Sequence, residues 1–145
     1  SKSGALLAAG ASQWLMVDIK SREIVRPALL QRDGRPTDPR KSNCPAPLRL
    51  KKRKDLPILG QRPVYYTDLD ANDHVNNAVY SAIAMDFLPE DYRKKSLRDY
   101  SISFFTETGL GEQMTLSGQA EGDGFALQGS AEGSPRFGCR FSFGD

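Results

Sequence analysis

The sequence contains few residues of the kinds that bind metals or form disulfide frameworks. Its 145 residues include one histidine and two cysteines, Cys44 and Cys139, which lie far apart and match no metal-ligand spacing. The sequence therefore predicts no metal site and no cofactor. Two isolated cysteines also make a poor disulfide framework, which favours the reducing cytoplasm as the location of the protein.

Long apolar runs and a strong excess of one charge are lacking as well. No apolar run approaches the ~20 residues that cross a bilayer, so no membrane association is expected. The Ala/Leu-rich start, SKSGALLAAGASQWLM, is short and continues into a strand pattern, which argues against a signal peptide. The net charge is only +2, which argues against a general affinity for nucleic acid. The length predicts one domain, with at most a fragment of a second.

Residues 1–26 contain the pattern of a β-hairpin. The run Trp14–Ile19 is mostly apolar, and a short apolar pair, Ile24 and Val25, follows a polar turn. An isolated hairpin is marginally stable in water, so these strands are expected to pair with something else.

Residues 27–61 are predicted to form a linker. Seven of the nine prolines fall between Pro27 and Pro63, and each one removes a backbone donor and fixes φ. A structureless connection of this length is rare inside one compact domain. The linker carries a basic run made of Lys51, Lys52, Arg53 and Lys54. This run is either a solvated part of the linker or a docking patch for an acidic partner, since no aromatic residues are interleaved for nucleic-acid stacking.

The chain is organised around the stretch Asp68–Leu88. A polar loop containing the single histidine, His74, changes abruptly into an apolar helix, and Asn76 or Asn77 is suited to cap its first turn. Apolar residues cover most of the circumference of this helix, which predicts that it is buried on nearly all sides. The positive N-terminal end of a helix beside His74 is a suitable place to stabilise developing negative charge.

Strand patterns flank this helix. A short strand is expected at Val64–Thr67, before it. Four further strands with period-2 alternation are expected after it, separated by Gly-rich turns, at residues 99–105, 112–120, 124–131 and 136–144. One helix and five strands, the last four as an antiparallel meander, predict an α+β fold. An antiparallel sheet that covers such a helix must wrap around it, which is the hotdog fold.

Three stretches resemble one known family. DLDANDHVNNAVY, the later YSISFFTETGLGEQM and the hairpin WLMVDIKSREIVRP resemble the acyl-acyl-carrier-protein thioesterases. Members of that family are tandem hotdogs. The resemblance therefore implies that residues 1–26 are the terminal hairpin of a first hotdog unit, that 27–61 link the units, and that 62–145 form a hotdog thioesterase domain. It also implies pairing with another hotdog unit, here in a homo-oligomer.

The family resemblance implies hydrolysis of a fatty acyl thioester and assigns catalytic roles to four residues by their match to the family motif: Asp70, Asn72, His74 and Glu107. Plant members carry a cysteine directly after the acid, where this chain has Thr108. Neither Cys44 nor Cys139 is placed to substitute for it, so the departure argues against a cysteine nucleophile.

The chemistry of a thioester suggests a role for each group. Glu107 would activate water or attack the acyl carbon directly, and His74 would orient the substrate or supply a proton to the departing sulfur. Asn72 would hold the water or the Glu107 carboxylate. Asp70 would fix His74 or the loop, although such an aspartate is also a common turn former. Backbone N–H groups around Val75 and Asn76 are expected to polarise the acyl carbonyl.

Three functions fit the sequence. The first is release of fatty acid from acyl carrier protein in fatty acid biosynthesis, with the basic run Lys51–Lys54 docking the acidic carrier. The second is hydrolysis of acyl-CoA by a homodimer of the same fold. The third is a truncated, non-catalytic hotdog module. The sequence specifies no preferred acyl length.

Overall fold

The computed structural model describes residues 7–18, 20–21, 23–25 and 44–144, which fall in two compact units, Ser1–Pro47 and Leu48–Asp145. In the first unit, β1 (Met16–Val17) pairs antiparallel with β2 (Ile24–Val25). The predicted hairpin is therefore confirmed, with strands shorter than the sequence suggested. The first part of the predicted linker, residues 27–43, lies outside the described residues.

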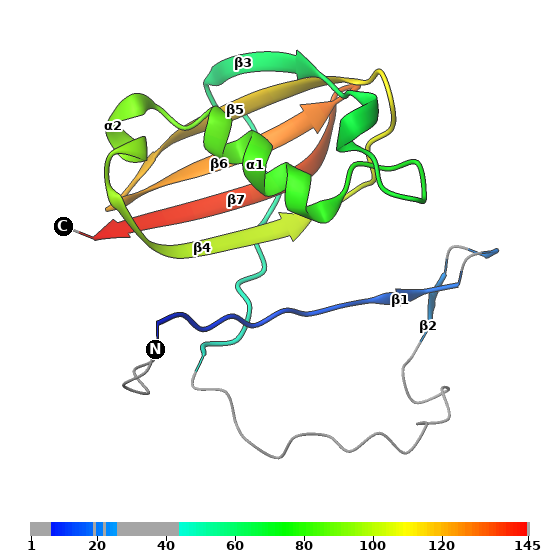
Figure 1. The fold of residues 1–145 in the computed structure, drawn as a ribbon, viewed down its shortest axis with the longest axis horizontal. Helices are drawn as coiled ribbons and strands as arrows, with labels where there is room; N and C mark the ends of the chain where they lie inside the picture. Colours follow the sequence, from blue (N-terminus) through cyan, green and yellow to red (C-terminus); the bar gives the residue numbers. More distant parts are fainter. Residues whose placement is uncertain (1–6, 19, 22, 26–43, 145) are drawn as a thin grey trace. The chain divides into compact units, whose positions relative to one another are not determined.

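The second unit is built on a five-stranded antiparallel sheet with the strand order β3-β5-β6-β7-β4 (Figure 1). The strands are β3 (Ile58–Pro63), β4 (Ser96–Phe104), β5 (Gln113–Glu121), β6 (Gly124–Ala131) and β7 (Ser134–Gly144). The remaining elements are the 3-10 helix η2 (Tyr66–Asp68) and the helices α1 (Asn77–Asp86) and α2 (Glu90–Arg93). None of the helices in the described part of the chain has the length and apolarity needed to span a membrane.

The predicted four-stranded meander is wrong at its first strand. Strands β5, β6 and β7 follow one another as neighbours, but β4 pairs with β7 and lies at the edge of the sheet opposite β3. The reason is the helix that precedes β4. Helix α1 runs along one face of the sheet, so the chain leaves β3 at one edge and starts β4 at the other (Figure 1).

The prediction of a strand at Val64–Thr67 is also wrong. The first strand of the sheet is β3, which begins inside the predicted linker and ends at Pro63. Proline is tolerated in this strand since it lies at the edge of the sheet. The next residues turn instead of extending. The Asp68 carboxylate accepts a hydrogen bond from the Tyr65 N–H at 2.8 Å and from Arg62 at 2.7 Å.

Helix α1 begins where the sequence predicted, with the Asn76 side chain accepting a hydrogen bond from the Ala78 N–H at 2.9 Å. The prediction that it is buried on nearly all sides is wrong. Its residues Tyr80, Ile83 and Ala84 are buried, whereas Ala78, Ala82 and Met85 are exposed. A single five-stranded sheet covers only one face of the helix.

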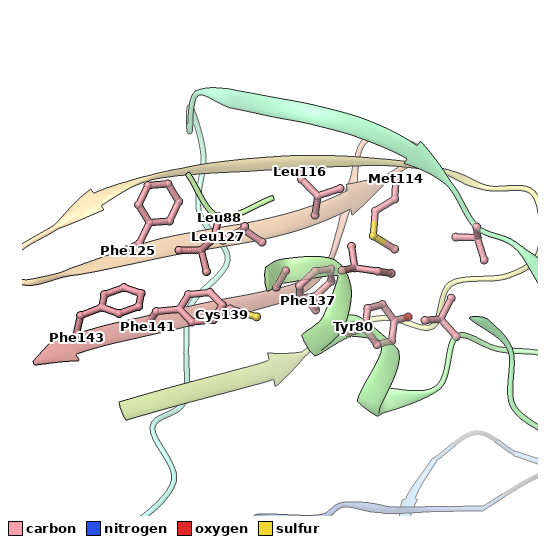
Figure 2. Packing of buried hydrophobic residues seen from close by; sticks show 14 residues of the cluster. Tyr80, Leu88, Met114, Leu116, Phe125, Leu127, Phe137, Cys139, Phe141 and Phe143 are labelled. Carbon is pink, nitrogen blue, oxygen red and sulfur yellow. The ribbon is translucent and has the colours of Figure 1, made fainter. Parts of the chain in front are cut away.

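The core lies between α1 and the sheet (Figure 2). Phe137 is fully buried at its centre, and its ring lies 5.0 Å from the Tyr80 ring, measured between centroids. The ring of Phe137 also lies over Gly129 on β6. A Cβ atom at residue 129 would approach this ring to 2.1 Å, so the close contact requires glycine there.

The segment before β3 is hydrogen-bonded to the sheet, although most of its residues are exposed. The Leu50 N–H donates to the Ser103 hydroxyl at 3.1 Å. The Gln128 side-chain amide accepts from the Arg53 N–H at 2.8 Å and donates to the Arg53 carbonyl at 3.1 Å. Residues 48–57 therefore form part of the second unit, although the sequence predicted a linker there.

Candidate active site

His74 and Glu107 meet at one end of α1. His74 lies in the loop between η2 and α1 (residues 69–76, the His74 loop), and Glu107 lies in the loop between β4 and β5 (residues 105–112, the Glu107 loop). The two loops pair antiparallel, with His74 opposite Gly109 and the Val75 N–H donating to the Thr108 carbonyl at 2.9 Å. This pairing places His74 Nε2 3.3 Å from Glu107 Oε2, with side chains 32% and 57% exposed.

Asp70 and Asn72 shape the His74 loop. The Asp70 carboxylate accepts the Asn72 N–H at 2.8 Å, and the Asp70 N–H donates to the His74 carbonyl at 2.8 Å. The pKa of the exposed Asp70 carboxyl is lowered, because hydrogen bonds stabilise its charged form. The backbone N–H of Asn72 has the largest effect, and the backbone N–H of His74 has a smaller one. These bonds match the turn-forming alternative for Asp70, and they hold the backbone that presents His74.

The prediction that Val75 and Asn76 supply oxyanion donors is contradicted. The Val75 N–H donates to the Thr108 carbonyl, and the Asn76 N–H donates to the Asp68 carbonyl, each at 2.9 Å. Both groups are consumed by the pairing that builds the site, so neither is available to a substrate. The physical reason is that the backbone of the His74 loop pairs with the Glu107 loop and with η2, contacts that the sequence alone did not reveal.

Thr108 is fully buried, and its hydroxyl oxygen accepts a hydrogen bond from the Tyr80 hydroxyl at 2.8 Å. Burial raises the pKa of the Tyr80 hydroxyl. Thr108 is therefore part of the floor under Glu107 and is not accessible as a nucleophile. Cys139 is also buried, and burial raises the pKa of its thiol to about 12, so it remains protonated near neutral pH.

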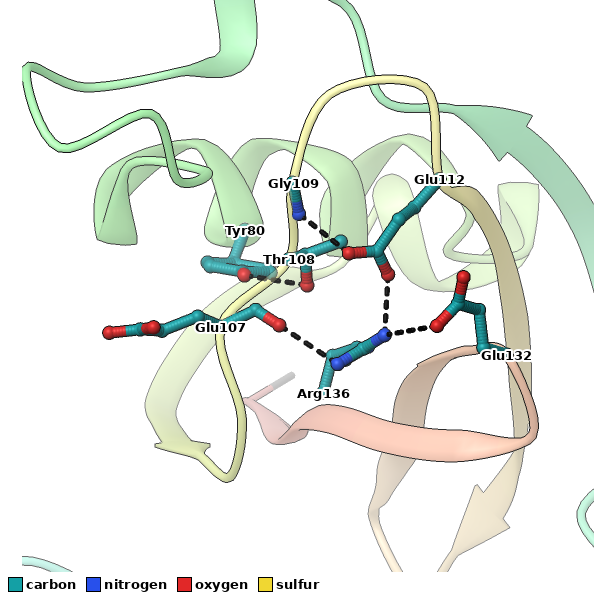
Figure 3. Close-up of polar contacts among 7 residues, drawn as sticks. All are labelled: Tyr80, Glu107, Thr108, Gly109, Glu112, Glu132 and Arg136. Carbon is teal, nitrogen blue, oxygen red and sulfur yellow. Dashed lines mark hydrogen bonds and ion pairs between the residues drawn. The ribbon is translucent and has the colours of Figure 1, made fainter. Parts of the chain in front are cut away.

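Two residues that lie next to Glu107 in the structure, Arg136 and Glu112, were not singled out by the sequence reasoning. They form an ion pair at 2.5 Å beneath the Glu107 loop (Figure 3). In the sequence, Arg136 falls at an outward position in the alternating pattern of β7, which is typical of a solvated charge. Glu112 falls at the end of a Gly-rich turn. Charge and spacing alone gave no signal that the two residues meet, because 23 residues separate them.

The basic run is only partly available to a partner. Arg53 forms an ion pair with Glu121 at 2.5 Å, and the Lys52 ammonium lies 5.6 Å from the centroid of the Phe105 ring. Lys51 and Lys54 are exposed and make no ion pair within the described residues. Because Phe105 opens the Glu107 loop, Lys52 is held close to the chain segment that carries Glu107.

Comparison with known proteins places this geometry in context. The family model of the acyl-ACP thioesterase C-terminal domain, where ACP is acyl carrier protein, matches residues 51–140. A search of curated protein sequences found no match. Among solved structures, the chain is similar to an acyl-ACP thioesterase from Bacteroides thetaiotaomicron, with a TM-score of 0.70, 18% identity, and coverage of 88% of this chain and 53% of that chain.

Two further structures extend the comparison. The 12:0-ACP thioesterase from Umbellularia californica has a TM-score of 0.66 and 17% identity, with 88% of this chain and 52% of that chain covered. A Staphylococcus aureus protein solved in complex with CoA has a TM-score of 0.54 and 16% identity, with 63% of this chain and 77% of that chain covered. The chain thus spans about half the length of the two acyl-ACP thioesterases it resembles.

An antiparallel sheet in the order β3-β5-β6-β7-β4, packed on a helix that starts directly after the His74 loop, defines a hotdog domain. The predicted α+β hotdog fold is therefore confirmed. The family model matches well over half of the chain. The chain belongs to the family of acyl-ACP thioesterase C-terminal domains, and the sequence-based resemblance to this family is confirmed.

Proposed function

We propose that this protein hydrolyses acyl thioesters, with His74 and Glu107 at the reacting centre. The observation that carries the proposal is the 3.3 Å contact between His74 Nε2 and Glu107 Oε2, in a domain of the acyl-ACP thioesterase family. Both side chains are partly exposed, so a substrate and a water molecule can reach them. A general base within hydrogen-bond reach of water is what hydrolysis requires.

The proposed reaction uses water as the nucleophile. The Glu107 carboxylate removes a proton from water, and the water oxygen attacks the acyl carbon. The carbon–sulfur bond then breaks, and the proton held by Glu107 passes to the departing sulfur, directly or through His74. Because a thiol has a pKa of about 8.5, the thiolate leaves without full protonation. Asp70 contributes by holding, through the Asn72 N–H, the loop that presents His74. The Asn72 side chain is proposed to hold the water or the Glu107 carboxylate.

A backbone donor for the oxyanion is proposed at the start of α1. Asn77 is the first residue of the helix, and within the described residues its N–H has no hydrogen-bond partner. The partial positive charge of the helix N-terminus adds to the effect of this donor on an acyl oxygen. Asn77 therefore replaces Val75 and Asn76 as the proposed donor.

Acyl-ACP is proposed as the substrate, in fatty acid biosynthesis in the cytoplasm. The family match supports it, and so does the exposed pair Lys51 and Lys54, since carrier proteins are generally acidic. The test compares kcat/KM on acyl-ACP and on acyl-CoA with the same acyl group. A clear preference for acyl-CoA would replace this substrate by the CoA ester. Absence of turnover on both would favour a non-catalytic module.

Reversing the two free lysine charges should weaken the use of acyl-ACP selectively. We expect the double variant Lys51→Glu/Lys54→Glu to lower kcat/KM for acyl-ACP about 10-fold at low ionic strength, because electrostatic steering raises association rates by at least that factor. The loss should shrink as salt is added. Hydrolysis of an uncharged acyl-pantetheine should stay unchanged. Equal losses on both substrates, or no loss with acyl-ACP, would show that these lysines do not dock the carrier.

Pairing with a second hotdog unit is proposed through the edge strand β4. Within the described residues the sheet ends at β4, and the apolar side chains of Leu97 and Phe104 are exposed along it. An unpaired strand edge beside exposed apolar side chains is a template for association. Sedimentation equilibrium of the purified chain should give twice the chain mass of 16.0 kDa. A mass of one chain at micromolar concentration would contradict a homo-oligomer.

A further inference from the structure

The Glu107 loop has no helix or strand of its own between the end of β4 at Phe104 and the start of β5 at Gln113. Glu107 itself is largely exposed, and the contact with His74 is made by a long, flexible side chain. A loop of this kind presents a carboxylate in one direction only if its backbone is fixed by other groups. Backbone pairing with the His74 loop fixes one side of it. Further groups hold it from beneath, on the side away from His74.

Arg136 holds the start of the loop through its backbone and its side chain. Its carbonyl accepts the N–H groups of Phe105 at 2.7 Å and Thr106 at 3.3 Å. Its guanidinium Nη1 donates to the Glu107 carbonyl at 2.9 Å. Figure 3 shows the consequence: the Glu107 carbonyl points toward Arg136, and the Glu107 carboxylate points away from it.

Glu112 holds the other end of the same loop. One carboxylate oxygen accepts the Gly109 N–H at 2.8 Å, and the other lies 2.5 Å from Arg136 Nη2. Glu132 approaches the same guanidinium nitrogen at 3.6 Å from the exposed side. The Arg136 and Glu112 side chains are only 9% and 20% exposed. The ion pair thus ties both ends of the loop to β7 with charged groups that are mostly removed from water.

We infer that Arg136 and Glu112 are a positioning pair, whose ion pair fixes the Glu107 loop so that the Glu107 carboxylate faces His74. A buried ion pair loses much of its Coulomb energy to desolvation, so stability alone is a weak reason to place one here. Its directional hydrogen bonds to Glu107 and Gly109 give it a geometric role. The inference rests on the proposed hydrolysis for its catalytic consequence, but the contact it controls can be measured without substrate.

The test uses the untagged protein, in which His74 is the only histidine. Its imidazole ring therefore gives one unambiguous Cε1–H resonance. The variants are Glu107→Gln, which removes the facing charge, and Arg136→Met/Glu112→Gln, which removes the pair but keeps an acceptor for the Gly109 N–H. Removing only one of the two charges would leave the other buried without a partner, which destabilises the fold strongly. The double variant avoids this. Glu90→Gln/Lys94→Met, which removes an exposed ion pair on α2, is the matched control.

We expect the Arg136→Met/Glu112→Gln double variant to move the His74 resonance at fixed pH in the same direction as Glu107→Gln, by at least about half as much. With an acyl-pantetheine, we expect kcat to fall about 10- to 100-fold with little change in KM, because a reacting group misplaced by about 1 Å costs on the order of 10²-fold. The single variant Arg136→Lys keeps the charge but cannot reach both partners. Its kcat and its His74 resonance should lie between those of the wild type and of the double variant. The control variant should match the wild type in both readouts.

A His74 resonance that stays at the wild-type position in the Arg136→Met/Glu112→Gln variant, while Glu107→Gln moves it, would overturn the inference. A resonance that even Glu107→Gln leaves in place would also overturn it, since the contact to be held would not exist. If Glu107→Gln moves the resonance but leaves kcat unchanged, the proposed role of Glu107 in hydrolysis fails. The positioning pair is then judged by the resonance alone.

Discussion

Replacing Glu107 with glutamine is expected to lower kcat for thioester hydrolysis by about 10²- to 10⁴-fold, the range found for lost general acid–base groups. The amide has nearly the same size and can still accept a hydrogen bond from His74, but it cannot take a proton from water. KM should change little, because the substitution removes an interaction that matters mainly in the transition state. Steady-state kinetics on a single acyl thioester over a range of concentrations measures both constants.

Glu90→Gln is the matched control for this experiment. Glu90 lies on α2, is exposed, and forms only an i,i+4 ion pair with Lys94. Such surface pairs contribute little to stability, so the control should retain wild-type turnover. Equal turnover in the Glu107→Gln variant and the wild type would remove Glu107 from the reaction.

Replacing Phe137 with alanine is expected to lower the free energy of unfolding by about 3–5 kcal/mol, which is the usual cost of emptying a buried Phe site. Phe137 has no exposed surface, and its ring packs at an angle against the Tyr80 ring, whose hydroxyl donates a hydrogen bond to Thr108 in the Glu107 loop. The neighbouring Gly129 has no side chain that could fill the space. A loss of this size is a large fraction of the stability of an ordinary domain. Urea unfolding followed by circular dichroism measures it.

Phe104→Ala is the matched comparison in the same assay. Phe104 also contacts the Tyr80 ring, with 5.6 Å between centroids, but it is 44% exposed at the edge of the sheet. At protein concentrations low enough to keep the chain unpaired, its loss should therefore cost about 1 kcal/mol, in line with ordinary single substitutions. If the two alanine variants lose the same stability, the core is not centred on Phe137 as described.

The parts of the fold that were predictable from the sequence are those with strong local periodicity. Strands β5, β6 and β7 alternate apolar and polar residues and are joined by Gly-containing turns, and each was predicted to within two residues at either end. The start of α1 was predictable because Asn76 carries a local capping signal. These signals depend on neighbours in the sequence and need no knowledge of the tertiary structure.

The parts that were not predictable depend on tertiary context. Strand β3 follows Pro57 and ends at Pro63, and proline ordinarily argues against a strand, but an edge position tolerates it. The position of β4 next to β7 follows from how α1 crosses the sheet, which no periodicity encodes. The exposed face of α1 was misjudged for the same reason, since an apolar sequence does not specify what covers it.

The candidate site shows the same division. His74 and Glu107 were chosen from motifs, and the structure brings them within 3.3 Å. The use of the Val75 and Asn76 N–H groups in backbone pairing was not predictable, because their acceptors, Thr108 and Asp68, were not known to be neighbours. Arg136 and Glu112 likewise meet only through the fold.

A double-mutant cycle on kcat with the variants His74→Ala, Glu107→Gln and their combination tests most directly whether the two side chains act as one unit. Groups that act as a unit are strongly non-additive, so the double variant should be within about threefold of the slower single variant. Losses that multiply independently in the double variant would contradict a shared reacting centre at the 3.3 Å contact between His74 and Glu107.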